Sequence, residues 1–144
     1  MTQDLSLDLH ALTARLDRGA DRILRKEAGI SYPRFLLLFM VGETTTTQRS
    51  LAQRMGVTEP SISRMVATLV GEGLLRVDNT RGGGNRHSVR LSARGRSLVQ
   101  KCYSLLESRL VDLVKASGVP YEQYARHTKR LLATLEAATA PLSA

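Results

Sequence analysis

The fold is decided by the stretch QRSLAQRMGVTEPSISRMV, which runs from residue 48 to residue 66. Ala52 is a small residue in the first half of this stretch, and it lets a second helix approach the first. Gly56 supplies a turn residue that accepts a positive φ. Ile62 and Met65 give the second half an apolar inner face. Together these residues predict a helix-turn-helix.

The outer face of the second helix carries groups that suit contact with DNA. Its N-terminal part, which enters the major groove in this motif, holds Thr58, Ser61, Ser63 and Arg64. An arginine there can donate two hydrogen bonds to guanine O6 and N7, and short hydroxyls can contact bases or phosphates. Gln48 begins the preceding helix, where the helix dipole favours a phosphate contact. These five residues are the DNA-binding candidates of the motif itself.

A basic hairpin is predicted directly after the motif. Two short extended segments, residues 74–77 and 88–91, flank a glycine-rich tip. The region 76–96 contains six arginines and one acid. Such a wing can lie along a minor groove, where the negative potential favours arginine. The wing residues expected to contact DNA are Arg81, Arg86 and His87, and which of the two arginines enters the groove stays open.

Two further helices are predicted before the motif. Apolar residues recur at three- and four-residue steps over residues 5–24, as in an amphipathic helix, and Gly29 closes that helix. Ser31 is an N-cap for the next helix, with Pro33 in its first turn. The apolar run 35–41 has no polar side, so we expect it at the buried centre of the fold.

The remaining segments complete a mainly α fold with a small β-hairpin wing. The threonines at 44–47 favour an extended segment, and the spacing of Thr45 and Gln48 predicts a capping box at the start of the motif. Ser92 caps a long helix after the wing, and Pro120 opens a last one. The expected architecture is a winged helix-turn-helix with helices on both sides.

The composition is that of a folded protein with a basic excess. The 21 Lys and Arg outnumber the 13 Asp and Glu, which gives a net charge of +8. Such an excess suits nucleic acid, an anionic membrane surface or solubility alone, and its concentration in the hairpin favours a polyanion contact. The longest apolar run is too short to cross a bilayer, so no membrane partner is expected. With one cysteine and no secretory signal, a cytoplasmic location is expected.

Catalytic and metal-binding patterns are missing from the sequence. We find no nucleophile with a base, no paired carboxylates and no phosphate loop. His10, His87 and His127 fall in separate predicted elements, so neither a metal nor another cofactor is expected. Cys102 occupies an apolar helical position, which favours a small buried hydrophobe over a sensor thiol. We therefore expect a binding protein and not an enzyme.

Three stretches resemble the MarR family of winged helix-turn-helix regulators. They are the quoted residues 48–66, LVGEGLLRV at 69–77 and VRLSARGR at 89–96. The order and lengths of the flanking helices also fit, so the resemblance covers nearly the whole chain. The wing departs from the family pattern, because residues 82–87 lack the aspartate that usually orients the wing arginine.

The resemblance implies a sequence-specific transcriptional regulator that binds double-stranded DNA. The expected form is a homodimeric repressor, joined through its first and last helices, on a palindromic operator. Arg64 matches the arginine common in the family's recognition helix. A winged-helix module that contacts protein or RNA without operator specificity stays the alternative. Residues 1–144 are expected to form one domain, with a winged helix-turn-helix at 31–97 and helical dimerisation parts at 1–30 and 98–144.

The resemblance also implies a small-molecule effector. Members of the family often release DNA when a small aromatic or phenolic anion binds between the dimer helices and the winged part. The candidate lining residues here are Arg15, Tyr32 and Arg34. Two surface arginines and a partly buried tyrosine fit the same sequence equally well, so both interpretations stay open.

Overall fold

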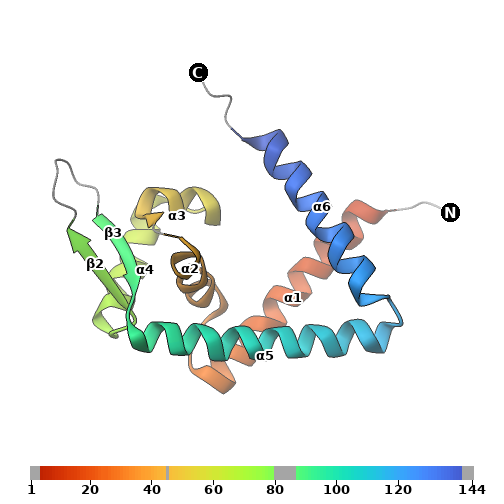
Figure 1. Ribbon diagram of the computed structural model, residues 1–144, viewed down its shortest axis with the longest axis horizontal. Coiled ribbons are helices and arrows are strands. Elements are labelled where there is room, and N and C mark those ends of the chain that lie inside the picture. The colour runs from red at the N-terminus through yellow and green to blue at the C-terminus, as the bar shows by residue number, and fades with distance from the viewer. Residues whose placement is uncertain (1–3, 45, 80–86, 141–144) are drawn as a thin grey trace. The chain divides into compact units, whose positions relative to one another are not determined.

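The computed structural model describes residues 4–44, 46–79 and 87–140 of the chain. The order of elements is the predicted one: two helices, a short strand, two helices, a hairpin and two more helices (Figure 1). In chain order they are α1 (Leu5–Ala28), α2 (Tyr32–Glu43), β1 (Thr46–Thr47), α3 (Gln48–Met55), α4 (Glu59–Gly71), β2 (Leu75–Asn79), β3 (His87–Leu91), α5 (Ala93–Ser117) and α6 (Tyr121–Thr139). The mainly α fold with a small β wing is thereby confirmed.

The chain divides into two compact units, Met1–Ser104 and Leu105–Ala144. The first unit holds every element from α1 to β3 and the start of α5. The second holds the rest of α5 and all of α6. The expected division into a winged part and dimerisation parts stays a prediction, since it concerns what these segments do.

Local capping residues set most of the helix ends. Gly29 ends α1 with a φ of 68°. The Ser31 hydroxyl accepts the backbone N–H of Arg34 at 3.4 Å, which begins α2 as predicted. At the start of α5 the Ser92 Oγ accepts the Gly95 N–H at 3.0 Å. A hydroxyl in this position satisfies one of the N–H groups that the first turn leaves without a partner.

The predicted capping box at Thr45 and Gln48 is wrong. Thr47 is the N-cap of α3, and its Oγ1 accepts the N–H of Ser50 at 3.2 Å. The reason is tertiary: Thr46 and Thr47 form β1 and pair with β3, which keeps the backbone extended up to the residue before Gln48. The helix therefore begins two residues later than a box capped by Thr45 would allow.

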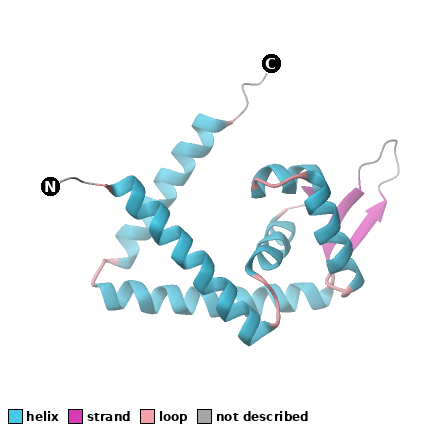
Figure 2. Cartoon of the chain, turned by 180° about the vertical axis from the view of Figure 1, so that it is seen from behind, coloured by secondary structure: helices cyan, strands magenta, loops and turns pink. Residues whose placement is uncertain are grey.

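The three strands form one antiparallel sheet in the order β1-β3-β2. Leu75 pairs with Leu91 at the base of the hairpin, and Val89 pairs with both Thr46 and Val77. Val89 is fully buried because its strand is the central one. Figure 2 shows the strands at the outer edge of the winged-helix segment, beside α4.

Apolar side chains from every helix of the first unit meet in its core. In α2 the side chains of Phe35, Leu37, Leu38 and Val41 are buried, which confirms the expected central place of this helix. The other fully buried side chains of the unit include Leu24, Leu51, Ile62, Leu69, Val89 and Cys102. Burial of this apolar surface is the main favourable contribution to folding.

The junction between the wing and α5 is close-packed. The Ser92 N–H donates to the Leu74 carbonyl at 3.1 Å, and the Ser92 Oγ donates to the Gly73 carbonyl at 2.6 Å. Gly95 lies against the same chain segment: a Cβ on Gly95 would stand 2.2 Å from the Leu74 oxygen. Only a glycine allows α5 to start this close to the segment between α4 and β2.

The second unit consists mainly of exposed helix. Val114 of α5 is buried, whereas α6 has no buried residue. Leu131, Leu132 and Leu135 of α6 are 66%, 55% and 61% exposed. The helices of the described ranges are too short or too polar to cross a bilayer.

Candidate nucleic-acid interface

The helix-turn-helix lies where the sequence predicts it, at α3 and α4. Gly56 has a φ of 67°, and its N–H closes the end of α3 on the carbonyls of Ala52 and Gln53. Thr58 Oγ1 accepts the Ser61 N–H at 3.2 Å and so begins α4. Ile62 is fully buried, with 0% of its surface accessible. The inner face of α4 is therefore fixed in the core, which leaves the opposite face for a partner.

The predicted contact residues differ in how far they reach the surface. Thr58, Ser63 and Arg64 are exposed, whereas Ser61 and Gln48 are half-buried. The hydroxyl of Thr58 already serves as the cap of α4. The Arg64 side chain forms no ion pair among the described residues, and only its carbonyl is engaged, by the Thr68 hydroxyl at 3.0 Å. Its guanidinium can therefore turn to a ligand on the outer face of α4.

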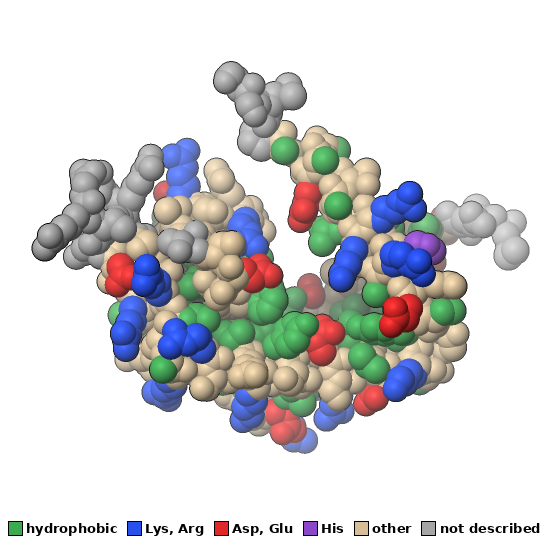
Figure 3. Space-filling model, in the orientation of Figure 1, with side chains coloured by type: hydrophobic (Ala, Val, Ile, Leu, Met, Phe, Trp, Pro, Cys, Tyr) green, Lys and Arg blue, Asp and Glu red, His purple; other side chains and the backbone are tan. Residues whose placement is uncertain are grey.

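Charge is distributed unevenly over the winged-helix segment. Residues 31–97 contain ten arginines, no lysine and four acids, so six of the eight net positive charges lie here. Figure 3 shows more Lys and Arg side chains than Asp and Glu over this segment on the face in view. Each of the four acids pairs with an arginine: Glu72 with Arg34 (3.6 Å), Glu59 with Arg49 (3.7 Å), Glu43 with Arg54 (3.3 Å) and Asp78 with Arg90 (3.0 Å). The arginine beside each acid thus offsets part of the repulsion that the acid exerts on a polyanion.

These ion pairs are not predictable from the sequence alone. Three of them join different helices or their ends, and the partners lie 10 to 38 positions apart in the sequence. The excess of arginine over acid was visible in the composition, but which arginine faces which acid depends on how the helices pack. Four described arginines of the segment form no ion pair with a described residue: Arg64, Arg76, Arg94 and Arg96. Of these, Arg94 and Arg96 donate to the carbonyls of Glu72 and Leu91.

The wing is the hairpin of β2 and β3. Across it the Arg90 Nε contacts the Asp78 Oδ2 at 3.0 Å, and Ser88 Oγ donates to the Asp78 carbonyl at 3.4 Å. The two predicted wing contacts Arg81 and Arg86 lie outside the described residues. His87 is the first residue of β3, and its side chain is likewise outside the description. Their roles stay predictions.

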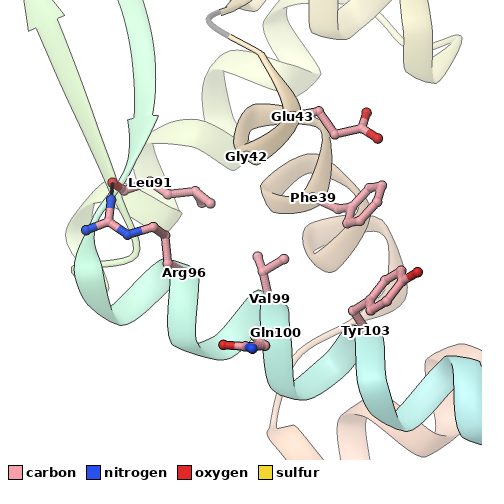
Figure 4. A pocket seen from close by; sticks show the side chains of 8 residues that line it. All are labelled: Phe39, Gly42, Glu43, Leu91, Arg96, Val99, Gln100 and Tyr103. Carbon is pink, nitrogen blue, oxygen red and sulfur yellow. Dashed lines mark hydrogen bonds between the residues drawn. The ribbon is translucent and has the colours of Figure 1, made fainter.

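A hollow of about 410 Å³ opens between α2 and the start of α5 (Figure 4). Its aromatic side is formed by Phe39 and Tyr103, whose rings are stacked with centroids 5.8 Å apart and planes 3° from parallel. Leu91, at the end of β3, points across the hollow towards Gly42, and Val99 lies between the two sides (Figure 4). Arg96 stands at the rim, where its Nη1 donates to the Leu91 carbonyl at 3.3 Å. The volume lies within the range usual for small-molecule sites.

The predicted effector residues lie elsewhere in the first unit. Arg15 is exposed on α1. Arg34 pairs with Glu72. Tyr32 is half-buried, and burial, together with the negative charge of Asp17, raises the pKa of its phenol. None of the three candidates lines the aromatic hollow or a second hollow of about 420 Å³ beside the end of α1. No hydrogen bond or ion pair joins Arg15 to Tyr32 or Arg34 among the described residues, so their common role stays a prediction.

The pKa shifts of Cys102 and Asp21 have structural causes, namely burial and hydrogen bonds. Cys102 is fully buried, and this burial raises the pKa of its thiol, as expected for a small hydrophobe. Asp21 accepts the Tyr32 N–H at 2.9 Å and the Arg25 Nε at 2.8 Å, and these bonds lower the pKa of its carboxyl. Among the residues that the structure describes, no group of three or more His, Cys, Asp or Glu gathers as metal ligands do.

Comparison with known proteins gives a family match over part of the chain and a fold for nearly all of it. The model of the MarR family matches residues 28–84. Wild-type MarR from E. coli is 20% identical, with a TM-score of 0.76 over 94% of this chain and 99% of that chain. The transcriptional regulator BldR from Sulfolobus solfataricus is 23% identical, with a TM-score of 0.73 over 92% and 99%. Staphylococcus aureus MarR in complex with salicylate and kanamycin is 16% identical, with a TM-score of 0.81 over 97% and 93%.

No curated protein matches the chain in sequence. The similarity to the solved structures therefore describes the fold, and it extends over both units of the chain. The family match covers the end of α1, α2, the complete helix-turn-helix and β2, which include the Gly56 turn and the exposed Arg64. Residues 28–84 thus match the MarR family, and the whole chain shares the fold of the solved MarR proteins.

Proposed function

We propose that this protein is a transcriptional regulator that binds double-stranded DNA sequence-specifically, as a homodimeric repressor on a palindromic operator. The observation that carries the proposal is the charge of the outer face of α4. Arg64 is exposed there and forms no ion pair with a described residue, whereas each acid of residues 31–97 is paired with an arginine. A face of this kind attracts a polyanion, and the Arg64 guanidinium stays available to donate hydrogen bonds to a base.

In this mechanism the start of α4 enters the major groove. Arg64 donates to guanine O6 and N7, while the exposed Ser63 hydroxyl and Thr58 contact bases or phosphates. Gln48 contacts a phosphate from the N-terminus of α3, with Ser61 behind the contact surface. The wing adds a minor-groove contact through Arg81 or Arg86, with His87 beside them.

Selection of bound sequences from a random DNA library tests the proposal. The wild-type protein should enrich an inverted repeat whose half-sites lie about one helical turn apart. Arg64→Ala should cost about 1–3 kcal/mol on that operator and relax the preference at one position of each half-site. Arg22→Ala, an exposed arginine of α1, is the control. Equal losses on operator and random duplex for Arg64→Ala would argue against base contact, and no preference among duplexes would favour an interaction module instead.

The homodimer is proposed because α6 offers an apolar face that its own chain leaves exposed. Leu131 and Leu135 lie one turn apart on α6 and are 66% and 61% exposed. Green side chains are visible along this helix in Figure 3. A second copy would cover such a face. Light scattering should give twice the chain mass of 15.8 kDa for the wild type and the single mass after Leu131→Lys and Leu135→Lys; a monomeric wild type would contradict the proposal.

A small aromatic anion is proposed as the effector. Two proteins of the same fold have been solved with such compounds: Staphylococcus aureus MarR with salicylate, and NadR with 4-hydroxyphenylacetate. In this chain the hollow beside Phe39 and Tyr103 offers a stacking surface for a ring, with Arg96 at the rim for a carboxylate. Salicylate should raise the melting temperature of the wild type and not of Phe39→Ala, whereas an equal rise in both would place the ligand elsewhere.

A further inference from the structure

One ion pair joins the two helices of the motif at their N-terminal ends. Arg49 is the second residue of α3 and Glu59 is the first residue of α4. The Arg49 Nε lies 3.7 Å from the Glu59 Oε1. Both helices begin here, on the side proposed to face the DNA, so the Glu59 carboxylate stands at the tip of the helix that is to enter the groove.

The pair is not needed to hold the helices together. The two side chains are 78% and 62% exposed, and an ion pair so open to water contributes little to stability. Burial of Leu51 and Ile62 and the hydrogen bond that caps α4 already fix the arrangement. The pair can therefore be altered without loss of the fold.

A carboxylate at this position has two consequences for DNA binding. It repels the phosphates and so lowers the affinity for every duplex. A hydrogen bond from a base to the carboxylate would offset this loss. The amino group N4 of cytosine is the usual major-groove donor for a glutamate. Arg49 stands beside Gln48, whose position favours a phosphate contact, but its guanidinium is drawn towards Glu59 instead. Without Glu59, this arginine would be free to hold a phosphate of any sequence.

We propose that Glu59 is a specificity-determining residue, and that Arg49 is the partner that it restrains. Glu59 keeps Arg49 from an indiscriminate phosphate contact and favours half-sites that present a cytosine amino group to the tip of α4. This inference rests on the proposed DNA binding. In this mechanism an acidic residue, and not a further arginine, makes the protein prefer its operator over other DNA.

Glu59→Gln tests the inference through affinity and its salt dependence. The affinity of this variant for a random duplex should rise roughly 3- to 10-fold, and the slope of log K against log salt should become steeper by about 0.9, the contribution of one added phosphate contact. The ratio of operator to random affinity should fall, and library selection should lose a cytosine at one position of each half-site. Addition of Arg49→Gln to this variant should return the slope to the wild-type value, because the freed arginine is gone.

Glu72→Gln is the matched control. Glu72 follows the last residue of α4 and pairs with Arg34 at 3.6 Å, so it has the same charge and nearly the same pair geometry at the opposite end of the helix. Its substitution should leave the slope and the affinity ratio unchanged.

The experiment distinguishes failure of the inference about Glu59 from failure of the proposed function. If the wild type prefers its operator but Glu59→Gln shows the wild-type slope and ratio, the inference is wrong and the proposed function stands. A change of equal size in Glu72→Gln would also overturn the inference, since loss of any acid would then suffice. If the wild type shows no preference for any duplex, the proposed function fails, and the inference fails with it.

Discussion

Gly95→Ala should destabilise the protein, although alanine is the better helix former. Gly95 lies in the first turn of α5, where a Cβ would stand 2.2 Å from the Leu74 carbonyl oxygen and 3.3 Å from the Leu91 Cδ2. The Leu74 carbonyl cannot simply retreat, because it accepts the N–H of Ser92 at 3.1 Å. The backbone of the α4–β2 junction or of α5 must therefore move.

The size of the effect follows from that distance. An ordinary contact between a carbon and a carbonyl oxygen is about 3.3 Å, so a shift of roughly 1 Å is needed. Forcing extra volume into a well-packed site typically costs about 1–3 kcal/mol, and the backbone contact places Gly95 at or above the upper end. The higher helix propensity of alanine returns about 1 kcal/mol. We expect a net loss of about 2 kcal/mol, which corresponds to a fall in Tm of roughly 4–8 °C for a chain of this size.

Gly19→Ala is the control, since Gly19 lies inside α1 with no heavy atom within 4 Å of the added Cβ. That substitution should be neutral or raise stability by up to about 1 kcal/mol. Unfolding in denaturant, followed by circular dichroism, gives the free energy of unfolding of both variants. If Gly95→Ala is as stable as Gly19→Ala, the close approach of α5 to Leu74 is not a constraint and the argument fails.

Three other predictions concern the same unit. Ser92→Ala removes the cap of α5 and the bond to the Gly73 carbonyl, so the free energy of unfolding should fall by about 1–2 kcal/mol; a change no larger than that of the exposed Ser97→Ala would contradict it. Because hydrogen bonds lower the pKa of Asp21 below its ordinary 3.8, its contribution to stability is complete above that value and is lost as the pH falls through the folded pKa. Stability measured on acidification should therefore fall less steeply in Asp21→Asn, and equal slopes in the two proteins would exclude this role. Burial and a raised pKa should keep the Cys102 thiol from iodoacetamide in the folded protein; modification as fast as in denaturant would show that it is accessible.

The proposed DNA-contact surface combines parts that were predictable to different degrees. Helical spacing alone assigns Arg64 to the outer face of its helix, and in the structure it is exposed and forms no ion pair with a described residue. The spacing assigns Ser61 to the same face, but its side chain is half-buried, and its N–H donates to the cap at Thr58. The wing contacts Arg81 and Arg86 lie outside the described residues, so the choice between them stays a prediction.

The sequence by itself determined the features that depend on neighbouring residues. Gly56 turns the chain because a positive φ is open to glycine, and Ser31, Thr58 and Ser92 begin helices because a hydroxyl can reach an N–H three residues ahead. Apolar spacing likewise placed Ile62 in the core. These effects act within a turn of chain, so they can be predicted without knowledge of the rest of the fold.

Only the tertiary structure decided the features that join distant segments. The start of α3 moved to Gln48 because β1 pairs with a strand some forty residues later in the chain, and strand pairing outweighed the local capping signal. The Arg49–Glu59 pair and the approach of Gly95 to Leu74 depend in the same way on how helices pack. Packing geometry follows from the sum of many weak contacts, and no single residue or spacing carries it.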